Sequence, residues 1–215
     1  MRRLRVFTGL LAIATIAVAL AFVTGSTDMA SRYEEPAYTL VQTNPDFEVR
    51  TYAPTVEAQV TMPGTYGQAV SSAFRVLAGY IFGGNAPRAS IAMTTPVSAT
   101  PASERIAMTT PVSAAEGPRG WTVSFTMPSE KTLASLPAPN DARIQLVEVP
   151  GATWAVRKFR GRATDTRVAT ELAELERATS TAGVALSATT VVSQYNPPWV
   201  LGPWRRNEVR RPLAP

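Results

Sequence analysis

The 215-residue sequence contains no cysteine and no histidine. Without cysteine the chain has no disulfide framework, no thiol nucleophile, no iron–sulfur cluster and no cysteine-ligated zinc. Without histidine it has no Ser-His-Asp triad, no imidazole base and no histidine ligand for a metal or a haem iron. A metal or catalytic site would therefore have to use carboxylates, tyrosine, lysine, methionine or hydroxyl groups.

Charge is also scarce, because charged residues make up 17% of the sequence against 45% hydrophobic residues. This composition is typical of a globular chain rather than a disordered one. The net charge of +5 arises largely from arginines at the two ends of the chain. A nucleic-acid-binding domain would show a stronger basic stripe, so we expect no nucleic-acid partner.

One long apolar run is present, the 18 uncharged residues from Val6 to Val23, and three arginines precede it. This asymmetry predicts a cytoplasmic N-terminus and a folded part outside the cytoplasm. Residues 1–25 would be either a signal peptide, with an A-x-A site at Ala19–Ala21, or an uncleaved membrane anchor. The lack of a clear cleavage site after the run favours the anchor. Residues 26–37 read as a polar linker, so the domain is expected to be membrane-anchored or secreted.

Hydrophobic periodicity in the remaining sequence predicts two helices and several strands. Thr65 is the expected N-cap of the first helix, and Thr164 or Asp165 that of the second. Glycines at 83 and 183 are expected to end these helices. The expected helices cover residues 66–82 and 165–182, and the expected strands cover residues 56–62, 121–127, 144–149, 154–159 and 188–195, the last of these being the final strand.

The order of these elements repeats with an offset of about 99 residues, as a duplicated half-domain would. In each half, a hairpin of strands leads into a helix, and the turn at Pro150-Gly151 joins the second hairpin. The prediction is an α+β fold: a distorted antiparallel β-barrel of two pseudo-symmetric halves with two flanking helices, preceded by an N-terminal apolar helix.

A nine-residue segment, Ile91–Ala99, recurs without change as Ile106–Ala114. Its proline is expected to confine the segment to an edge strand or a bulge. Two copies of so short a unit do not make a solenoid. The paired Thr-Thr-Pro steps are expected to cap a strand or fix a bulge beside a pocket, and their hydroxyls are also available to a ligand.

Six stretches, in this order, resemble the SOUL/haem-binding protein family. They are Gly83–Asn85, the doubled Ile-Ala-Met-Thr-Thr-Pro-Val, Phe125–Pro128, Leu136–Asn140, Gln194–Pro198 and Arg205–Val209. The resemblance covers residues 38–213. It implies a fold of two pseudo-symmetric halves that form a distorted barrel flanked by two helices, in agreement with the duplication.

The resemblance also implies that a haem or another porphyrin binds reversibly and non-covalently, without a His ligand, in an apolar groove against the first helix. The family has a methionine where this chain has Ala78 and a cation where it has Gly79. The residues that the resemblance and the chemistry of haem single out are Phe74, Leu77 and Ala78 for the macrocycle, Arg75 and Arg88 for the propionates, and Met93 and Met108 as thioether ligands.

Each of these residues also has a structural interpretation. Phe74 and Leu77 lie on an apolar helical stripe that is typical of core packing, and methionines fill core gaps. Tyr66 and Tyr80 are phenolate candidates, or amphipathic residues at the boundary of the core. The acidic residues on predicted strands are expected to face solvent. Arg205, Arg206 and Glu208 are expected to form a salt-bridge cluster at the rim of the barrel.

We expect a binding protein of the cell envelope that buffers or transports a porphyrin, and not an enzyme, because no activated nucleophile–base pair or metal cage is recognisable. Two alternatives remain: an envelope interaction module without a ligand, and a sensor of small apolar or cationic ligands like an effector-binding domain. Acids lining the pocket would favour the sensor, whereas cations at its rim would favour a porphyrin.

Overall fold

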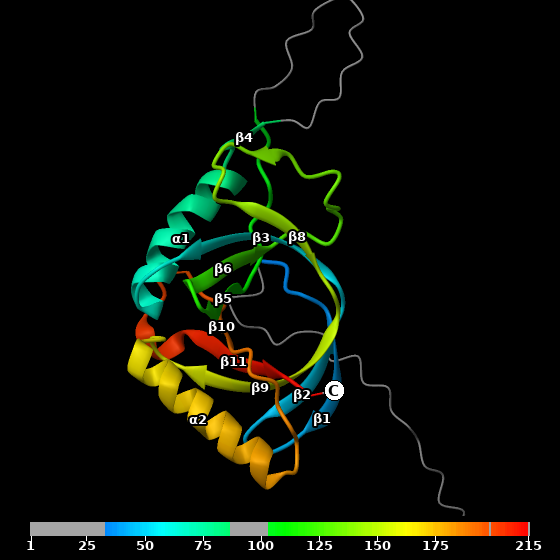
Figure 1. Ribbon diagram of the computed structural model, residues 1–215, viewed down its shortest axis with the longest axis vertical. Coiled ribbons are helices and arrows are strands. Elements are labelled where there is room, and N and C mark those ends of the chain that lie inside the picture. Colours follow the sequence, from blue (N-terminus) through cyan, green and yellow to red (C-terminus); the bar gives the residue numbers. More distant parts are fainter. Residues whose placement is uncertain (1–32, 87–102, 198, 215) are drawn as a thin grey trace, which may run out of the picture.

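The computed structural model describes residues 33–86, 103–197 and 199–214 (Figure 1). These residues form one antiparallel sheet of nine strands and two helices, which confirms the α+β class. The predicted N-terminal apolar helix lies outside the described residues. The helices are α1 (Tyr66–Ile81) and α2 (Asp165–Thr181); the sheet contains β1 (Tyr38–Thr43), β2 (Glu48–Tyr52), β3 (Thr55–Met62), β5 (Val112–Gly117), β6 (Gly120–Thr126), β8 (Gln145–Val149), β9 (Ala152–Arg160), β10 (Val191–Gln194) and β11 (Arg206–Pro212).

The sheet curls into a half-barrel, which agrees in part with the distorted antiparallel barrel expected from the sequence. Its strand order is β1-β2-β9-β11-β10-β5-β6-β3-β8, so β1 and β8 are its edges. If β2 is exchanged with β8, β9 with β3, β11 with β6 and β10 with β5, these eight strands have the same order when read from the other edge of the sheet. The topology therefore has the pseudo-symmetry that a duplicated half-domain requires. A separate ribbon pairs β4 (Asn85–Ala86) with β7 (Ala138–Pro139).

The two halves are joined by a long pairing of β2 and β3 with β9 and β8. Tyr52 pairs with Ala152 and Thr55 with Val149, so the register is the same on both sides of the bend. Both strands bend at the same level, next to prolines at positions 54 and 150. The predicted β8–β9 hairpin is therefore wrong: β8 pairs with β3 of the other half, and β9 pairs with β2 and β11.

Both helices pack against the sheet, and the duplication relates their positions. In Figure 1, α1 lies over β3 and β6, and α2 lies over β9 and β11. Thr164 caps α2 as predicted, because its hydroxyl accepts a hydrogen bond from the backbone of Arg167. Thr65 directly precedes α1, and its backbone N–H donates a hydrogen bond to the side-chain oxygen of Gln68. The apolar stripes of the helices meet alternate strand residues in a core that includes Val60, Ala73, Leu77, Val123, Leu175 and Val209.

Two strand predictions need correction. The second copy of the repeat is not an edge strand: after Pro111 it enters β5, which lies inside the sheet between β10 and β6. The proline precedes the ladder, so the strand loses no hydrogen-bond donor. The strand at 191–194 is also not the last, because β11 follows it and lies between β9 and β10. The sequence pattern did not predict β11, because charged residues interrupt its apolar alternation. The first copy of the repeat lies outside the described residues.

A buried ionic cluster joins β2 to β11. Its side chains alternate along these strands with those that point into the apolar core. The Arg50 guanidinium donates to both oxygens of Glu208 at 3.1 Å, and the Tyr195 hydroxyl donates to Glu208 at 2.6 Å. Arg50 and Glu208 are 1% and 2% exposed. Burial alone would lower the pKa of Arg50, but the Glu208 carboxylate raises it above its usual value. Glu208 therefore belongs to a cluster inside the sheet and not to the predicted rim.

Removing Glu208 takes away the fully buried counter-ion of Arg50 and leaves it only the partly exposed Glu48, at 2.6 Å. We expect Glu208→Gln to lower the free energy of unfolding by about 2–3 kcal/mol, because Glu48 still compensates part of the charge. Glu174→Gln is the matched control, because it breaks the exposed pair with Arg177, and it should cost at most about 1 kcal/mol. Urea unfolding of the full chain in detergent, followed by tryptophan fluorescence, measures both. Equal losses in the two variants would contradict the assigned role of the cluster.

Candidate functional site

An open, shallow groove of about 740 Å³ lies against the C-terminal half of α1, between this helix and the chain that precedes β8. We call it the α1 pocket. The hydroxyl of Tyr80 donates to the Pro137 carbonyl at 3.0 Å, and the backbone of Asn140 donates to the Gly84 carbonyl at 3.1 Å. These bonds fix the loop against the helix. The lining residues are Arg75, Val76, Gly79, Tyr80, Gly84, Asn140, Asp141, Ala142, Arg143 and Ile144.

Gly79 keeps the middle of this wall open. A Cβ atom built at this position has no heavy atom within 4 Å, so a side chain here would extend into free space. The helix end beside it is tight, because a Cβ at Gly84 would lie 2.7 Å from the Gly79 carbonyl oxygen. Position 79 can therefore accept a side chain, whereas position 84 is restricted to glycine.

Two arginines border the α1 pocket, and they differ in how they are held. Arg143 donates to both carboxylate oxygens of Asp141, at 3.0 and 2.6 Å. These side-chain hydrogen bonds lower the pKa of Asp141 to about 2, so its negative charge persists at neutral pH. Arg75 is exposed, and its Nε atom donates to the Ser71 carbonyl at 3.4 Å. Arg75 is therefore the cation that remains available to an anionic group.

The structure places the predicted haem-contacting residues on different sides of α1. Leu77 is fully buried in the core, and half-buried Phe74 meets the Phe125 ring at 5.4 Å, edge to face. Ala78 is half-buried, and only Arg75 of the predicted set lines the α1 pocket. Met108 is half-buried and packs against the core. Arg88 and Met93 lie outside the described residues.

Both tyrosine candidates use their hydroxyls in hydrogen bonds. Burial raises the pKa of Tyr66 to about 12, and its hydroxyl accepts a hydrogen bond from Gln194 at 2.7 Å. The Tyr80 hydroxyl is buried and donates to the Pro137 carbonyl. The described lining of the α1 pocket thus combines apolar side chains with the exposed Arg75 and contains no methionine. Besides the Tyr80 hydroxyl, its side-chain oxygens belong to Asn140 and to Asp141, which is held by Arg143.

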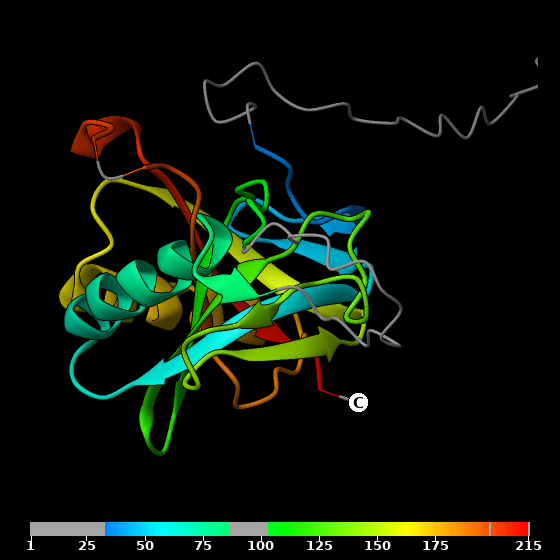
Figure 2. The same ribbon diagram turned by 90° about the horizontal axis from the view of Figure 1, so that it is seen from above.

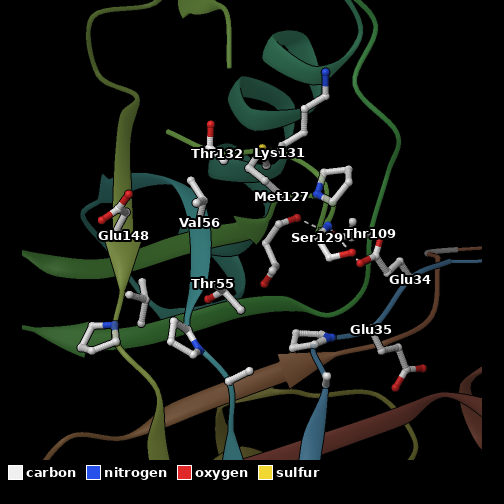
Figure 3. Close-up of a pocket in the computed structure, with 18 residues that line it drawn as sticks. Glu34, Glu35, Thr55, Val56, Thr109, Met127, Ser129, Lys131, Thr132 and Glu148 are labelled. Carbon is white, nitrogen blue, oxygen red and sulfur yellow. Dashed lines mark hydrogen bonds between the residues drawn. The ribbon is translucent and has the colours of Figure 1, made fainter. Parts of the chain in front are cut away.

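A second cavity of about 700 Å³ lies at the bend of the long pairing (Figure 3). We call it the acidic pocket. Its charged lining residues are Glu34, Glu35, Glu148 and Lys131, and Glu148 and Glu34 lie on opposite sides of it in Figure 3. The apolar part of the lining includes Pro36, Pro54, Val56, Met127, Pro128, Val149 and Pro150.

The segment before β1 forms one wall of the acidic pocket. A carboxylate oxygen of Glu34 accepts a hydrogen bond from the Ser129 backbone at 2.9 Å, and the Glu34 carbonyl accepts one from the Thr110 backbone. Glu35 forms an ion pair with Arg206 at 2.5 Å. Lys131 is paired with Glu104 at 2.6 Å. The Thr109 hydroxyl, inside the second repeat copy, donates to the Thr126 carbonyl.

Sequence reasoning missed most of both pockets. Glu34 and Glu35 were assigned to a polar linker, and nothing local shows that this segment folds back onto the sheet. Asp141 and Arg143 follow a proline-rich loop whose position depends on β8 pairing with the other half. Glu148 was considered as an isolated strand acid, and it is exposed. Glu57 was expected to face solvent, but it is buried and accepts a hydrogen bond from Gln59.

Comparison with protein families decides the relationship. A sequence model of the family described as SOUL heme-binding protein matches residues 33–211. This chain belongs to the SOUL haem-binding protein family. No curated protein matches the chain in sequence. The resemblance seen in the six motifs is thereby confirmed.

Solved structures show that the SOUL fold of this chain is shared with other proteins. A protein described as a hydrolase from Listeria innocua covers 81% of the chain at 15% identity with a TM-score of 0.50, and 94% of that protein is covered. The C-terminal domain of EcmrR covers 82% at 11% identity with a TM-score of 0.52, and 98% of that domain is covered. At these identities the likeness concerns the fold alone.

Two features are absent from the described residues of the SOUL domain. In residues 33–86, 103–197 and 199–214, no helix is long and apolar enough to cross a membrane. The same residues contain no group of three or more acidic side chains placed to hold a metal ion.

Proposed function

We propose that this SOUL domain binds a tetrapyrrole in the α1 pocket. Family membership supports the class of ligand, and the observation that carries the choice of site is exposed Arg75 beside the open face at Gly79. Val76 and Ile144 offer apolar contacts to a macrocycle, and a porphyrin propionate is the anion that pairs with an arginine at the rim.

Binding of this kind relies on the macrocycle and the propionates. When bound, a haem would bring redox-active iron, but the described lining of the α1 pocket contains no methionine, its Tyr80 hydroxyl is bonded to Pro137 and its Asp141 carboxylate is paired with Arg143. The iron should therefore contribute little to the affinity, and a zinc porphyrin should bind about as well as haemin. Such weak selectivity suits reversible buffering or transport, where the ligand must be released.

We infer a binding function rather than catalysis. The buried carboxylates are committed to the fold, because Glu208 is held by Arg50 and Tyr195, and Glu171 by Arg157 at 2.8 Å. The described lining of the two pockets contains no activated nucleophile–base pair. This interpretation is supported by the family description, which names binding and not a reaction.

We also propose that the domain is held at the outer side of a membrane. The support is the uncharged run from Val6 to Val23 with three arginines before it. Such a charge distribution keeps the N-terminus in the cytoplasm and carries the remainder across. A porphyrin buffer in that position would act in the cell envelope.

Position 79 allows a gain-of-function test of the site. We expect Gly79→Arg to tighten zinc-protoporphyrin and haemin binding about threefold to tenfold, because it adds a second cation to an open wall. Arg75→Glu should weaken binding by a similar factor. The measurement is a Soret titration of the full chain in detergent. Arg177→Glu on α2, an equally exposed arginine far from the α1 pocket, is the control and should change neither affinity.

Two results would overturn this assignment. One is an affinity that is the same in the parent chain, Gly79→Arg and Arg75→Glu, because the propionates would then lie elsewhere. The other is a response that never saturates in the parent chain, which would show only non-specific adsorption of porphyrin to protein and detergent.

The acidic pocket favours a second candidate function, the binding of a small aromatic cation. Three glutamates and one lysine line this largely apolar cavity. Lys131 is paired with Glu104 and Glu35 with Arg206, so Glu34 and Glu148 carry the excess negative charge. Glu148 is exposed and lies on β8 at one side of the cavity (Figure 3). An apolar cavity with excess negative charge disfavours propionates and suits a ligand that is both flat and positively charged.

Ethidium is a suitable probe of this candidate, since it is an aromatic cation whose fluorescence rises on binding. We expect Glu148→Gln to weaken ethidium binding to the full chain about threefold. The substitution removes a negative charge that lies closer to the bound cation than the Debye length, so salt screens their attraction little. Glu116→Gln, in the exposed β5–β6 hairpin, is the control for net charge. If both variants bind ethidium equally, the acidic pocket is not a cation site.

A further inference from the structure

The loop between β10 and β11 exposes an unusual concentration of apolar side chains. Among the described residues, seven large hydrophobic side chains are exposed, and three of them lie within six positions of this loop. Trp199 is 76% exposed, and Leu201 and Trp204 are each 64% exposed. We call residues 199–205 the tryptophan loop. It includes the short 3-10 helix η2 (Gly202–Trp204).

Hydrogen bonds hold this loop in an ordered shape. Arg205 donates from its side chain to the Val200 carbonyl at 2.8 Å, and its backbone donates to the Gly202 carbonyl at 3.1 Å. The Trp204 backbone donates to the Leu201 carbonyl at 3.1 Å. The two tryptophans are thus fixed outside the core by the loop itself, and binding through them would lose little conformational entropy.

Two exposed arginines lie beside the base of the tryptophan loop. The Gly161 backbone donates to the Arg205 carbonyl at 3.2 Å, which places its exposed neighbours Arg160 and Arg162 beside the loop. A Cβ at Gly202 would lie 3.6 Å from the Arg162 side chain. Exposed tryptophan and leucine side chains beside two arginines match a membrane interface, where amphipathic rings sit at headgroup depth and cations meet lipid phosphates.

The start of the described chain lies beside the same loop. Glu35 is ion-paired with Arg206, the residue that directly follows the tryptophan loop. In Figure 2 the blue start of the described chain and the red-orange loop both lie on the upper side of the molecule. Nine residues separate Tyr33 from the end of the apolar run at Val23. Nine residues span at most about 30 Å, so an anchored chain keeps the loop close to the bilayer.

We propose that the tryptophan loop docks onto the phospholipid surface, with Trp199 and Trp204 at headgroup depth and Arg160 and Arg162 against lipid phosphates. The proposal rests on the membrane anchor proposed above and is independent of tetrapyrrole binding. Docking would fix the orientation of the domain on the bilayer, so that the α1 pocket faces a constant direction relative to the membrane.

The test uses the full chain reconstituted into phosphatidylcholine–phosphatidylglycerol vesicles that contain a brominated phosphatidylcholine, whose bromine atoms quench tryptophan. The loop holds two of the four tryptophans, so we expect the parent chain to lose about half of its emission. Trp199→Phe/Trp204→Phe should lose almost none. Arg160→Glu/Arg162→Glu retains all four tryptophans and should show clearly reduced quenching, whereas the Arg177→Glu control should behave like the parent.

Several outcomes would overturn the proposal. If the chain floats with the vesicles but bromine quenches the parent and Trp199→Phe/Trp204→Phe equally, the loop does not touch lipid. A chain that fails to float removes the anchor and the docking with it. A blue shift that grows with protein concentration, without quenching, assigns the loop to contact between copies. Haemin titration of the same samples reports separately on the α1 pocket.

Discussion

The pairing of β2 and β3 with β9 and β8 is the constraint on which the other parts of the structure depend. It is the contact through which each half completes the sheet of the other, and its register is unbroken across the bend. Because β8 pairs with β3 and β9 with β2, neither half has its own complete sheet. The buried Arg50–Glu208 pair reinforces this arrangement, since it links β2 of the first half to β11 of the second.

Both pockets follow from this pairing, although they differ in charge. The acidic pocket forms where the paired strands bend together, and the segment before β1 closes one side of it. The α1 pocket forms because β8 brings the preceding loop, with Asp141 and Arg143, against the end of α1. In the sequence analysis, cations at the rim of a pocket indicated a porphyrin, and acids lining it indicated a sensor of small ligands. The described residues include a pocket of each kind, and family membership favours the ligand that suits the one bordered by arginines.

Local patterns predicted the elements well, but not their partners. The alternation at 56–62, the helical stripes and the cap at Thr164 report short-range preferences, and the structure contains each of them. Strand pairing depends on contacts that are distant in the sequence. The turn at Pro150-Gly151 therefore predicted a hairpin, although β8 and β9 on its two sides pair with other strands. Strand β11 was missed because its charged residues serve a buried cluster, which removes the usual apolar alternation. The haem groove was placed from the resemblance on Phe74 and Leu77, whereas the cavity lies on the other side of the helix. Whether those residues contact a porphyrin stays a prediction.

Mapping a bound porphyrin on the full chain tests the central claim most directly. Zinc protoporphyrin is diamagnetic, so amide resonances of the ¹⁵N-labelled chain in detergent micelles can be followed during its addition. The account predicts saturable shifts that are largest at Gly79, Gly84 and Asn140, around the α1 pocket. Shifts centred instead on Thr55, Met127 and Ser129 would place the ligand in the acidic pocket and contradict the proposed site.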